Sequence, residues 1–271
     1  MKTICQTYTN KATGFLSCLH ALKQTQEVES IHRMRVHIKK LRAISRFLYL
    51  DHSPEKQPDV FRKIFSLSGT LREIQLNRQG LHTYARTHKG LANYDQFLKE
   101  KEYTAAIAFK ASLEEFKETA LQKRVKEVKG ACQHVSSRNL YLKGKTYTRK
   151  ELSLIRKLLK KPGTEKRTHR IRRILRRMEP IISLSNQLKP SKSGQRLVRK
   201  IKETNRLLGN WHDEVVFRNS ILSFLENKEP KTFPTLKNLL FAVTQDRDSA
   251  LSKAKKHLSP LKKKTFLGLL E

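Results

Sequence analysis

The sequence predicts an all-α protein, and three observations lead to this class. Leu, Ile, Val and Phe recur at helical spacing through nearly the whole chain, whereas the alternation that is typical of β-strands is almost absent. Only 10 Gly and 8 Pro occur in 271 residues, so a loop-rich chain is excluded. A ten-residue motif in one helical segment also returns in a second segment 137 residues later. We therefore predict two four-helix bundles related by internal pseudo-two-fold symmetry.

Eight helices are expected in chain order. Their approximate ranges are 3–25, 28–51, 56–86, 92–137, 146–160, 164–187, 193–227 and 233–257. Glu29 or Ser30 can cap the second helix, and Pro54 and Pro58 separate it from the third. Later breaks fall at residues 162–164, 190–194 and 227–230. A seam near residues 138–148 divides the chain into predicted domains 1–140 and 141–271.

The charge of the chain is extreme and points to an anionic partner. There are 58 Lys plus Arg against 24 Asp plus Glu, which gives a formal net charge of +34. Charge of this size opposes compaction through self-repulsion, so a polyanion is the first partner to expect.

Membrane insertion and secretion are not indicated by the sequence. No run of about 18 apolar residues occurs, as a membrane-spanning helix would need. The N-terminal segment lacks a continuous apolar stretch and a cleavage site. Cys5, Cys18 and Cys132 form no CxxC pair and are expected to be free thiols. These observations predict a cytoplasmic protein without a membrane partner.

The internal repeat consists of two elements. Residues 32–41 and 169–178 share the pattern His-Arg-apolar-Arg-x-x-apolar-basic-basic-apolar. The helix that follows each motif carries a second element around Gly69 in the first half and Gly209 in the second, 140 residues apart. Two motifs that recur at nearly one offset indicate a duplicated helical unit. Gly209 is expected to permit close helix packing.

Each repeated helix has an apolar stripe and a separate basic stripe. The apolar stripes consist of Met34, Ile38, Leu41, Ile44 and Leu48 in the first half, and Ile171, Ile174, Leu175, Met178 and Ile182 in the second. The basic stripes consist of His32, Arg35, Lys39, Arg42 and Arg46, and of His169, Arg172 and Arg176.

The basic stripes break a local rule of helix stability in both halves. No acidic residue lies between Ser30 and Leu50, or between Lys166 and Arg177. Like charges one turn apart cost roughly 0.2–0.5 kcal/mol per pair, so the first stripe costs on the order of 1–2 kcal/mol if His32 is charged. An anion laid along the stripe would remove this repulsion, and side chains spaced about 5.4 Å apart suit a polymer of phosphates. Local rules broken in symmetric places indicate function.

These motifs resemble the CHAD family, whose name refers to conserved histidines in an α-helical domain. The family pattern H-x-x-R-V-x-x-[KR]-[KR]-x-R is complete in His32, Arg35, Val36, Lys39, Lys40 and Arg42. The second pattern is met at His169, Arg172, Arg176, Arg177 and Met178, and departs at Glu179, where the family usually has Arg. The glycine element of the family is well matched by residues 208–213.

The resemblance implies two four-helix bundles that face each other across a basic channel and bind inorganic polyphosphate without catalysis, often on polyphosphate granules or beside polyphosphate-metabolising enzymes. The motif matches carry His32, Arg35, Lys39, Lys40, Arg42, His169, Arg172, Arg176 and Arg177 over as phosphate contacts. Positions relative to the two glycines add Arg62, Arg72, Lys202 and His212. The helical wheel alone adds Arg46 and Arg173.

Other functions fit the residues less well. A nucleic-acid-binding protein agrees with the charge, but the stripes lack interleaved aromatic residues. A metal-dependent phosphohydrolase needs an acidic cluster, whereas the acidic residues are scattered along the sequence. His32 and His37 do not share a helix face, and no HExxH motif occurs. We therefore predict a protein that is not an enzyme and that has no cofactor or metal site.

Overall fold

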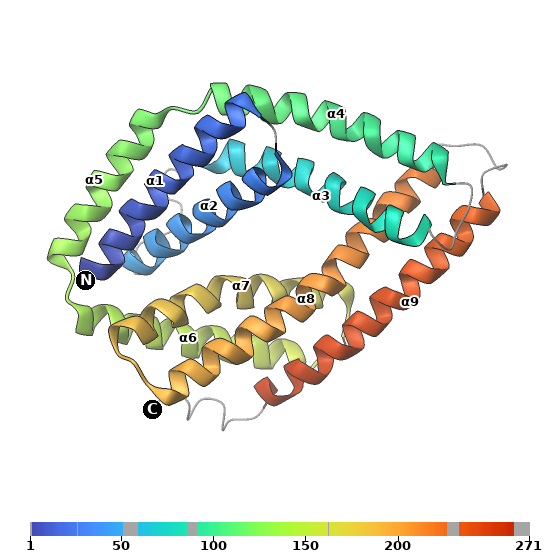
Figure 1. Cartoon of the computed structure of the whole chain (residues 1–271). Helices are drawn as coiled ribbons and strands as arrows, with labels where there is room; N and C mark the ends of the chain where they lie inside the picture. The colour runs from blue at the N-terminus through green and yellow to red at the C-terminus, as the bar shows by residue number, and fades with distance from the viewer. Residues whose placement is uncertain are drawn as a thin grey trace. The chain divides into compact units, whose positions relative to one another are not determined.

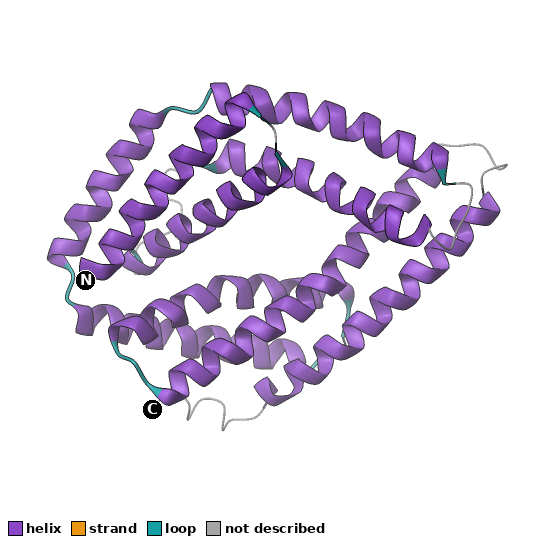
Figure 2. Ribbon diagram, in the orientation of Figure 1, coloured by secondary structure: helices purple, strands orange, loops and turns teal. Residues whose placement is uncertain are grey.

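The computed structural model describes residues 2–25, 27–50, 59–85, 91–161, 163–226 and 233–262. Within these ranges it contains nine α-helices, one short 3-10 helix and no strand, which confirms the predicted all-α class (Figures 1 and 2). The predicted helix breaks at Pro54, Pro58, Pro162 and residues 227–230 lie outside these ranges. None of the helices described is long and apolar enough to cross a membrane.

The helices follow one another in chain order. They are α1 (Lys2–Gln24), α2 (Val28–Leu48), α3 (Arg62–Ala85), α4 (Ala92–Glu114), α5 (Glu118–His134), α6 (Ser137–Leu159), α7 (Glu165–Leu188), α8 (Lys192–Leu225), α9 (Phe233–Leu258) and the 3-10 helix η3 (Ser259–Lys262).

The chain forms two compact units that are not continuous in sequence. The first unit comprises Met1–Phe61, Lys117–Arg206 and Lys256–Glu271, and the second comprises Arg62–Phe116 and Leu207–Lys255. Each unit therefore takes segments from both sides of residue 140. The division into repeats 1–140 and 141–271, and their two-fold relation, stay predictions from the sequence.

In the first unit, the predicted apolar stripes form the core. All five apolar positions of the stripe on α2 are buried, and so are all five on α7. Helix α2 contacts α1, α5, α6 and α7, and α6 also packs along α7. Burying one face of α2 and one face of α7 fixes the direction in which their basic residues project.

The second unit is built around aromatic side chains. Residues of α3 and α4 meet the later part of α8 and α9 in one buried cluster, which includes Tyr94, Phe217 and Phe224. The Tyr94 and Phe224 rings lie 5.2 Å apart between centroids, and the Tyr94 hydroxyl donates a hydrogen bond to Ser220 Oγ at 2.9 Å. Large aromatic rings of this kind dominate the energetics of a small core.

Two predicted helix boundaries are wrong. The sequence predicts one helix over 92–137, but the structure divides it at residues 115–117 into α4 and α5. No Gly or Pro marks this break; it falls where the chain leaves the second unit for the first. The sequence also predicts that the next helix begins at residue 146, but α6 begins at Ser137. Ser136 caps this helix by accepting a hydrogen bond from the Asn139 N–H at 3.1 Å.

The prediction of three free thiols is wrong for two of them. Helices α1 and α5 pack against each other, and Cys5 and Cys132 form a disulfide between them with a Cα–Cα distance of 6.5 Å. The two cysteines are 127 residues apart, so only the packing of the helices reveals the pair. Cys18 is a free cysteine. The cysteines therefore no longer support a reducing compartment.

Gly144, and not Gly209, permits a close approach of helices. A Cβ atom at Gly209 would meet no atom within 4 Å, so the prediction that this glycine allows close packing is wrong. At Gly144 of α6, a Cβ atom would overlap Ser185 Oγ of α7 and lie 3.0 Å from Phe47 Cε2 of α2. The absence of a side chain at Gly144 therefore lets α6 pack tightly against both neighbours.

Substitution of Gly144 tests this packing. Replacing Gly by Ala in a helix normally gains up to about 1 kcal/mol, but overpacking costs about 1–3 kcal/mol. We expect Gly144→Ala to lower the free energy of unfolding by about 1–2 kcal/mol in denaturant titrations.

Gly130 of α5 provides the control. A Cβ atom there would meet no atom within 4 Å, so Gly130→Ala should instead stabilise the protein by about 0.5–1 kcal/mol. Equal effects of the two substitutions would contradict the close packing of α6.

Candidate functional site

Cationic side chains of α2 and α7 come together in the first unit. Lys39 of α2 has its pKa lowered to about 8, first by partial burial and then by the positive charges of Arg176, Arg35 and Arg172. Two of these guanidinium groups belong to α7, which contacts α2. Much of the Lys39 side chain is exposed, so an anion can reach it. A bound anion can cancel the part of the pKa shift that the three neighbouring charges cause.

A second group of cations continues the first along both helices. The pKa of Arg46 is lowered by burial, and the charges of Arg177 and Arg42 lower it further. Residues nearer the C-terminus of α2 therefore lie beside residues nearer the C-terminus of α7. We call the six residues Arg35, Lys39, Arg46, Arg172, Arg176 and Arg177 the cationic track. The structure thus brings together positions that the sequence predicts from two separate motifs.

Carboxylates lie against two predicted phosphate contacts beside the track. Arg42 pairs with Asp59 through two contacts, Nε–Oδ1 at 3.2 Å and a terminal nitrogen to Oδ2 at 2.7 Å. Asp59 Oδ1 also accepts a hydrogen bond from the Phe61 N–H. His169 lies 3.7 Å from Glu165 Oε1 one turn earlier on α7. Sequence reasoning missed Asp59 because it follows Arg42 by 17 residues and precedes the next helix.

Tyr147 of α6 is a further residue that sequence reasoning missed. Burial raises its pKa, and the charges of Arg177 and Arg46 lower it. Its side chain is therefore a neutral neighbour of the track near physiological pH. No local motif marks Tyr147, since only the packing of α6 against α2 and α7 brings it there.

The remaining predicted site residues fall into two groups. His32, Lys40, Arg173 and Lys202 are residues of the first unit, on α2, α7 and the early part of α8. Arg62, Arg72 and His212 belong to the second unit. Their assignment as phosphate contacts stays a prediction from the resemblance.

The second unit gathers carboxylates, contrary to the prediction that acidic residues are scattered. Burial raises the pKa of Glu214 to about 7, and the charges of Asp246 and Asp213 add to this effect. Burial and Asp213 also raise the pKa of Glu73. Tyr84 donates a hydrogen bond to Asp246. Among the residues searched, no group of three or more His, Cys, Asp or Glu has an arrangement that could hold a metal ion.

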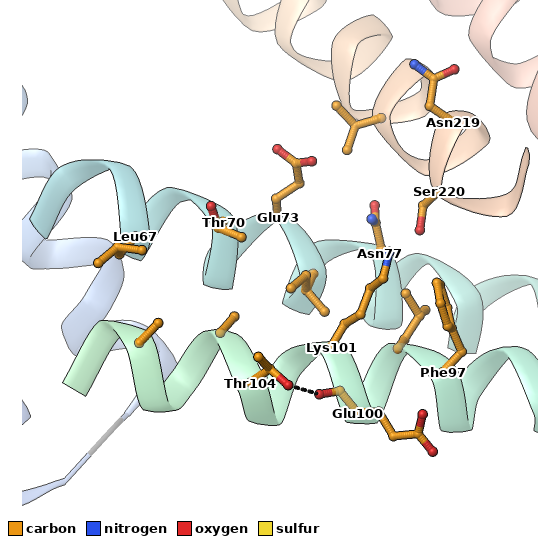
Figure 3. Close-up of a pocket in the computed structure, with 15 residues that line it drawn as sticks. Leu67, Thr70, Glu73, Asn77, Phe97, Glu100, Lys101, Thr104, Asn219 and Ser220 are labelled. Carbon is orange, nitrogen blue, oxygen red and sulfur yellow. Dashed lines mark hydrogen bonds between the residues drawn. The ribbon is translucent and has the colours of Figure 1, made fainter. Parts of the chain in front are cut away.

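The second unit also contains a cavity of about 750 Å³ between α3, α4 and the later part of α8 (Figure 3). Its lining is mainly apolar, with Glu73, Asn77 and Lys101 among the polar residues. The Lys101 ammonium lies 4.3 Å from the centre of the Phe97 ring. No residue predicted as a phosphate contact lines this cavity, so it is a separate feature without a sequence signal.

Comparison with known proteins identifies the family. The profile of the CHAD domain matches residues 15–166 and 154–270, so the chain belongs to the CHAD family. The crystal structure of the CHAD domain from the plant Ricinus communis superposes with a TM-score of 0.63 and 16% sequence identity. The match covers 99% of this chain and 90% of that chain, and at this identity it shows the fold alone. Comparison with curated proteins found no match.

The raised pKa of Glu214 predicts a pH-dependent stability. Between its ordinary pKa near 4.3 and its folded value of about 7, the native protein binds more protons than the unfolded chain, so stability falls as pH rises through this window. We expect Glu214→Gln to raise the melting temperature at pH 8 by roughly 2–4 °C, which allows for solvent screening of a partly buried group.

At pH 5 only the lower part of this window has been crossed, so the gain from Glu214→Gln should be clearly smaller than at pH 8. Thermal unfolding followed by circular dichroism measures both. A gain that is the same at pH 5 and pH 8 would show that the charge of Glu214 is not its cause.

Proposed function

We propose that this protein binds inorganic polyphosphate non-catalytically along the cationic track of α2 and α7. The observation that carries the proposal is the position of Lys39 among three guanidinium groups from two helices, where every charge of a described residue that acts on it is positive. Such a cluster is repulsive by itself and becomes favourable when an anion lies across it. Membership of the CHAD family and the matched motifs support the same partner.

The spacing of the track suits a linear polymer. Arg35 and Lys39 are one turn apart on α2, and Arg172 and Arg176 are one turn apart on α7. Successive cations on each helix are therefore separated by about 5.4 Å along the axis. Guanidinium groups can grip phosphate oxygens with two hydrogen bonds, and the Lys39 ammonium adds a mobile point charge. A polymer with a negative charge every few ångströms can contact both helices at once.

The proposed role is binding and not turnover. The residues of the track supply positive charge and hydrogen-bond donors, which retain a polyanion but do not activate water. We further propose that the protein acts in the cytoplasm, where binding would hold it on polyphosphate granules or beside enzymes of polyphosphate metabolism. Nucleic acid shares the phosphate chemistry and is the second candidate partner.

Removing one guanidinium group from each helix tests the track. Arg35→Ala combined with Arg172→Ala should weaken binding of long-chain polyphosphate by about 30- to 300-fold, because two charge-assisted contacts are lost. Isothermal titration calorimetry measures the affinity. The slope of log affinity against log salt concentration should also fall by about 1–2, by analogy with single-stranded nucleic acid.

A matched control removes the same charge elsewhere. Lys126 and Lys129 are exposed on α5, so Lys126→Ala with Lys129→Ala should leave affinity within about threefold of the parent. Unchanged affinity in a folded Arg35→Ala, Arg172→Ala variant would contradict the assignment of the track. Displacement of polyphosphate by RNA or duplex DNA at equal phosphate concentration would favour nucleic acid as the partner. Release of orthophosphate in Mg²⁺ would contradict the non-catalytic role.

The lowered pKa of Lys39 predicts that binding takes up a proton. In the free protein at pH 8.5, about three quarters of the Lys39 side chains are neutral, given a pKa of about 8. A bound polyanion reverses the local potential and returns the pKa towards its ordinary value. The complex then holds more protons than the free protein, so affinity should fall as pH rises above about 8.

Calorimetry at pH 8.5 in buffers of different ionisation enthalpy counts these protons. Lys39→Arg keeps the positive charge but cannot lose it in this range, so this variant should bind polyphosphate without the uptake. Equal proton uptake in the parent and in Lys39→Arg would assign the proton to another group.

A further inference from the structure

The cavity of the second unit combines an apolar wall with two polar side chains from one helix. Glu73 and Asn77 lie one turn apart on α3, and both line the cavity. Figure 3 shows both side chains projecting from α3 towards α8. The wall around them is mainly apolar and includes Ile74, Leu98 and Val216. A volume of about 750 Å³ is typical of pockets that bind small molecules.

Asn77 is a polar residue at a core position. It lies on the buried face of α3 with Leu71 and Leu81, and it is only 5% exposed. Its side-chain amide forms no hydrogen bond with any residue that the structure describes. Neither polar atom of the amide is among the side-chain atoms sealed inside the protein, so both can be reached from the cavity that Asn77 lines. Native proteins rarely keep a buried amide unless a partner, water or a ligand satisfies it.

Glu73 adds a negative charge that no described cation balances. Its side chain is partly exposed, and it forms no hydrogen bond or ion pair with a described residue. Partial burial raises the pKa of Glu73, and the carboxylate of Asp213, the one described charge that acts on it, raises the pKa further. The chain has 58 Lys plus Arg, so a carboxylate without a cation beside it is unexpected. A bound cation would relieve both causes of the shift.

Lys101 of α4 lines the cavity but does not supply this cation. Its ammonium lies 4.3 Å from the centre of the Phe97 ring, and its charge is not among those that act on Glu73. An anionic group bound to Asn77 would lie about one helical turn, or about 5.4 Å, from Glu73 and would be repelled by it. The two polar side chains of α3 therefore favour a ligand that carries hydrogen-bond donors and a positive charge.

We propose that this cavity binds a hydrophobic amine, which is a small molecule with one ammonium group and an apolar chain or ring. The ammonium donates hydrogen bonds to the Glu73 carboxylate and to Asn77 Oδ1. The apolar body packs against Ile74, Leu98 and Val216. The cavity belongs to the second unit and the cationic track to the first, so this proposal does not depend on polyphosphate binding.

Isothermal titration calorimetry of the full chain with octylamine, octanol and octanoate tests the proposal near neutral pH. The three probes share one hydrocarbon chain and differ only in the polar group. The net charge of +34 repels cations from the surface at large, so saturable binding of an amine requires a local site. One octylamine should bind per chain. Octanol should bind at least about tenfold more weakly, and octanoate no more tightly than octanol.

Substitutions separate the polar end of the cavity from its apolar wall. Glu73→Gln keeps the shape of the side chain and removes its charge, so octylamine affinity should fall at least about tenfold while octanol affinity stays within about twofold. Asn77→Ala should lower octylamine affinity about fivefold. Ala105 lines the cavity, so Ala105→Phe should weaken octylamine and octanol alike by filling the space. Thermal unfolding confirms that each variant folds, and the partly exposed position of Glu73 makes Glu73→Gln the safest of them.

Two controls make the result specific. Glu226 is exposed directly after α8 and does not line the cavity, so Glu226→Gln should keep octylamine affinity within about twofold. Arg35→Ala with Arg172→Ala should also keep it, whether or not that variant loses polyphosphate, so failure of this site and failure of the track are distinguishable. The proposal is overturned if octylamine shows no saturable binding, if octanol or octanoate binds as tightly, if folded Glu73→Gln keeps the affinity of the parent, or if Glu226→Gln loses as much.

Discussion

Repulsion between cations on two packed helices is the constraint on which the rest of the first unit depends. Burial of the apolar stripes of α2 and α7 leaves their basic stripes no freedom to turn away from each other. Burial of a large aliphatic side chain is worth about 1.5–3 kcal/mol, whereas each like-charge step along a helix costs only a few tenths of a kcal/mol. The core can therefore hold the charges together, and the repulsion remains available to be relieved by an anion.

The charges of the protein are sorted between the two units. In the first unit, Asp59 pairs with Arg42 and Glu165 lies near His169 at the edge of the cationic track, while the charges of the described residues that act on Lys39 are all positive. In the second unit, Glu214 lies beside Asp213 and Asp246, and its carboxyl is half neutral near pH 7. Clusters of like charge are unfavourable for folding. Proteins tend to keep such unfavourable clusters at functional regions.

The track offers long cationic side chains along two helices, so it suits an extended ligand and should be sensitive to salt. Membership of the CHAD family and the likeness to the Ricinus communis domain establish the fold on which the track lies.

The sequence by itself determined the helical class, the apolar faces of α2 and α7, and the cationic stripes. These features depend on the spacing of residues within one helix, where a period of 3.6 residues decides which side chains share a face. The repeated motif even indicated that two such stripes act together, and the proximity of Lys39 to Arg172 and Arg176 agrees with this.

Only the tertiary structure decided which distant residues meet. The pairing of Arg42 with Asp59, the disulfide of Cys5 with Cys132, the break between α4 and α5, and the cavity between α3, α4 and α8 have no local signal. Each depends on how segments from different parts of the chain pack, and packing is set by the fit of many side chains together and not by the period of any one helix.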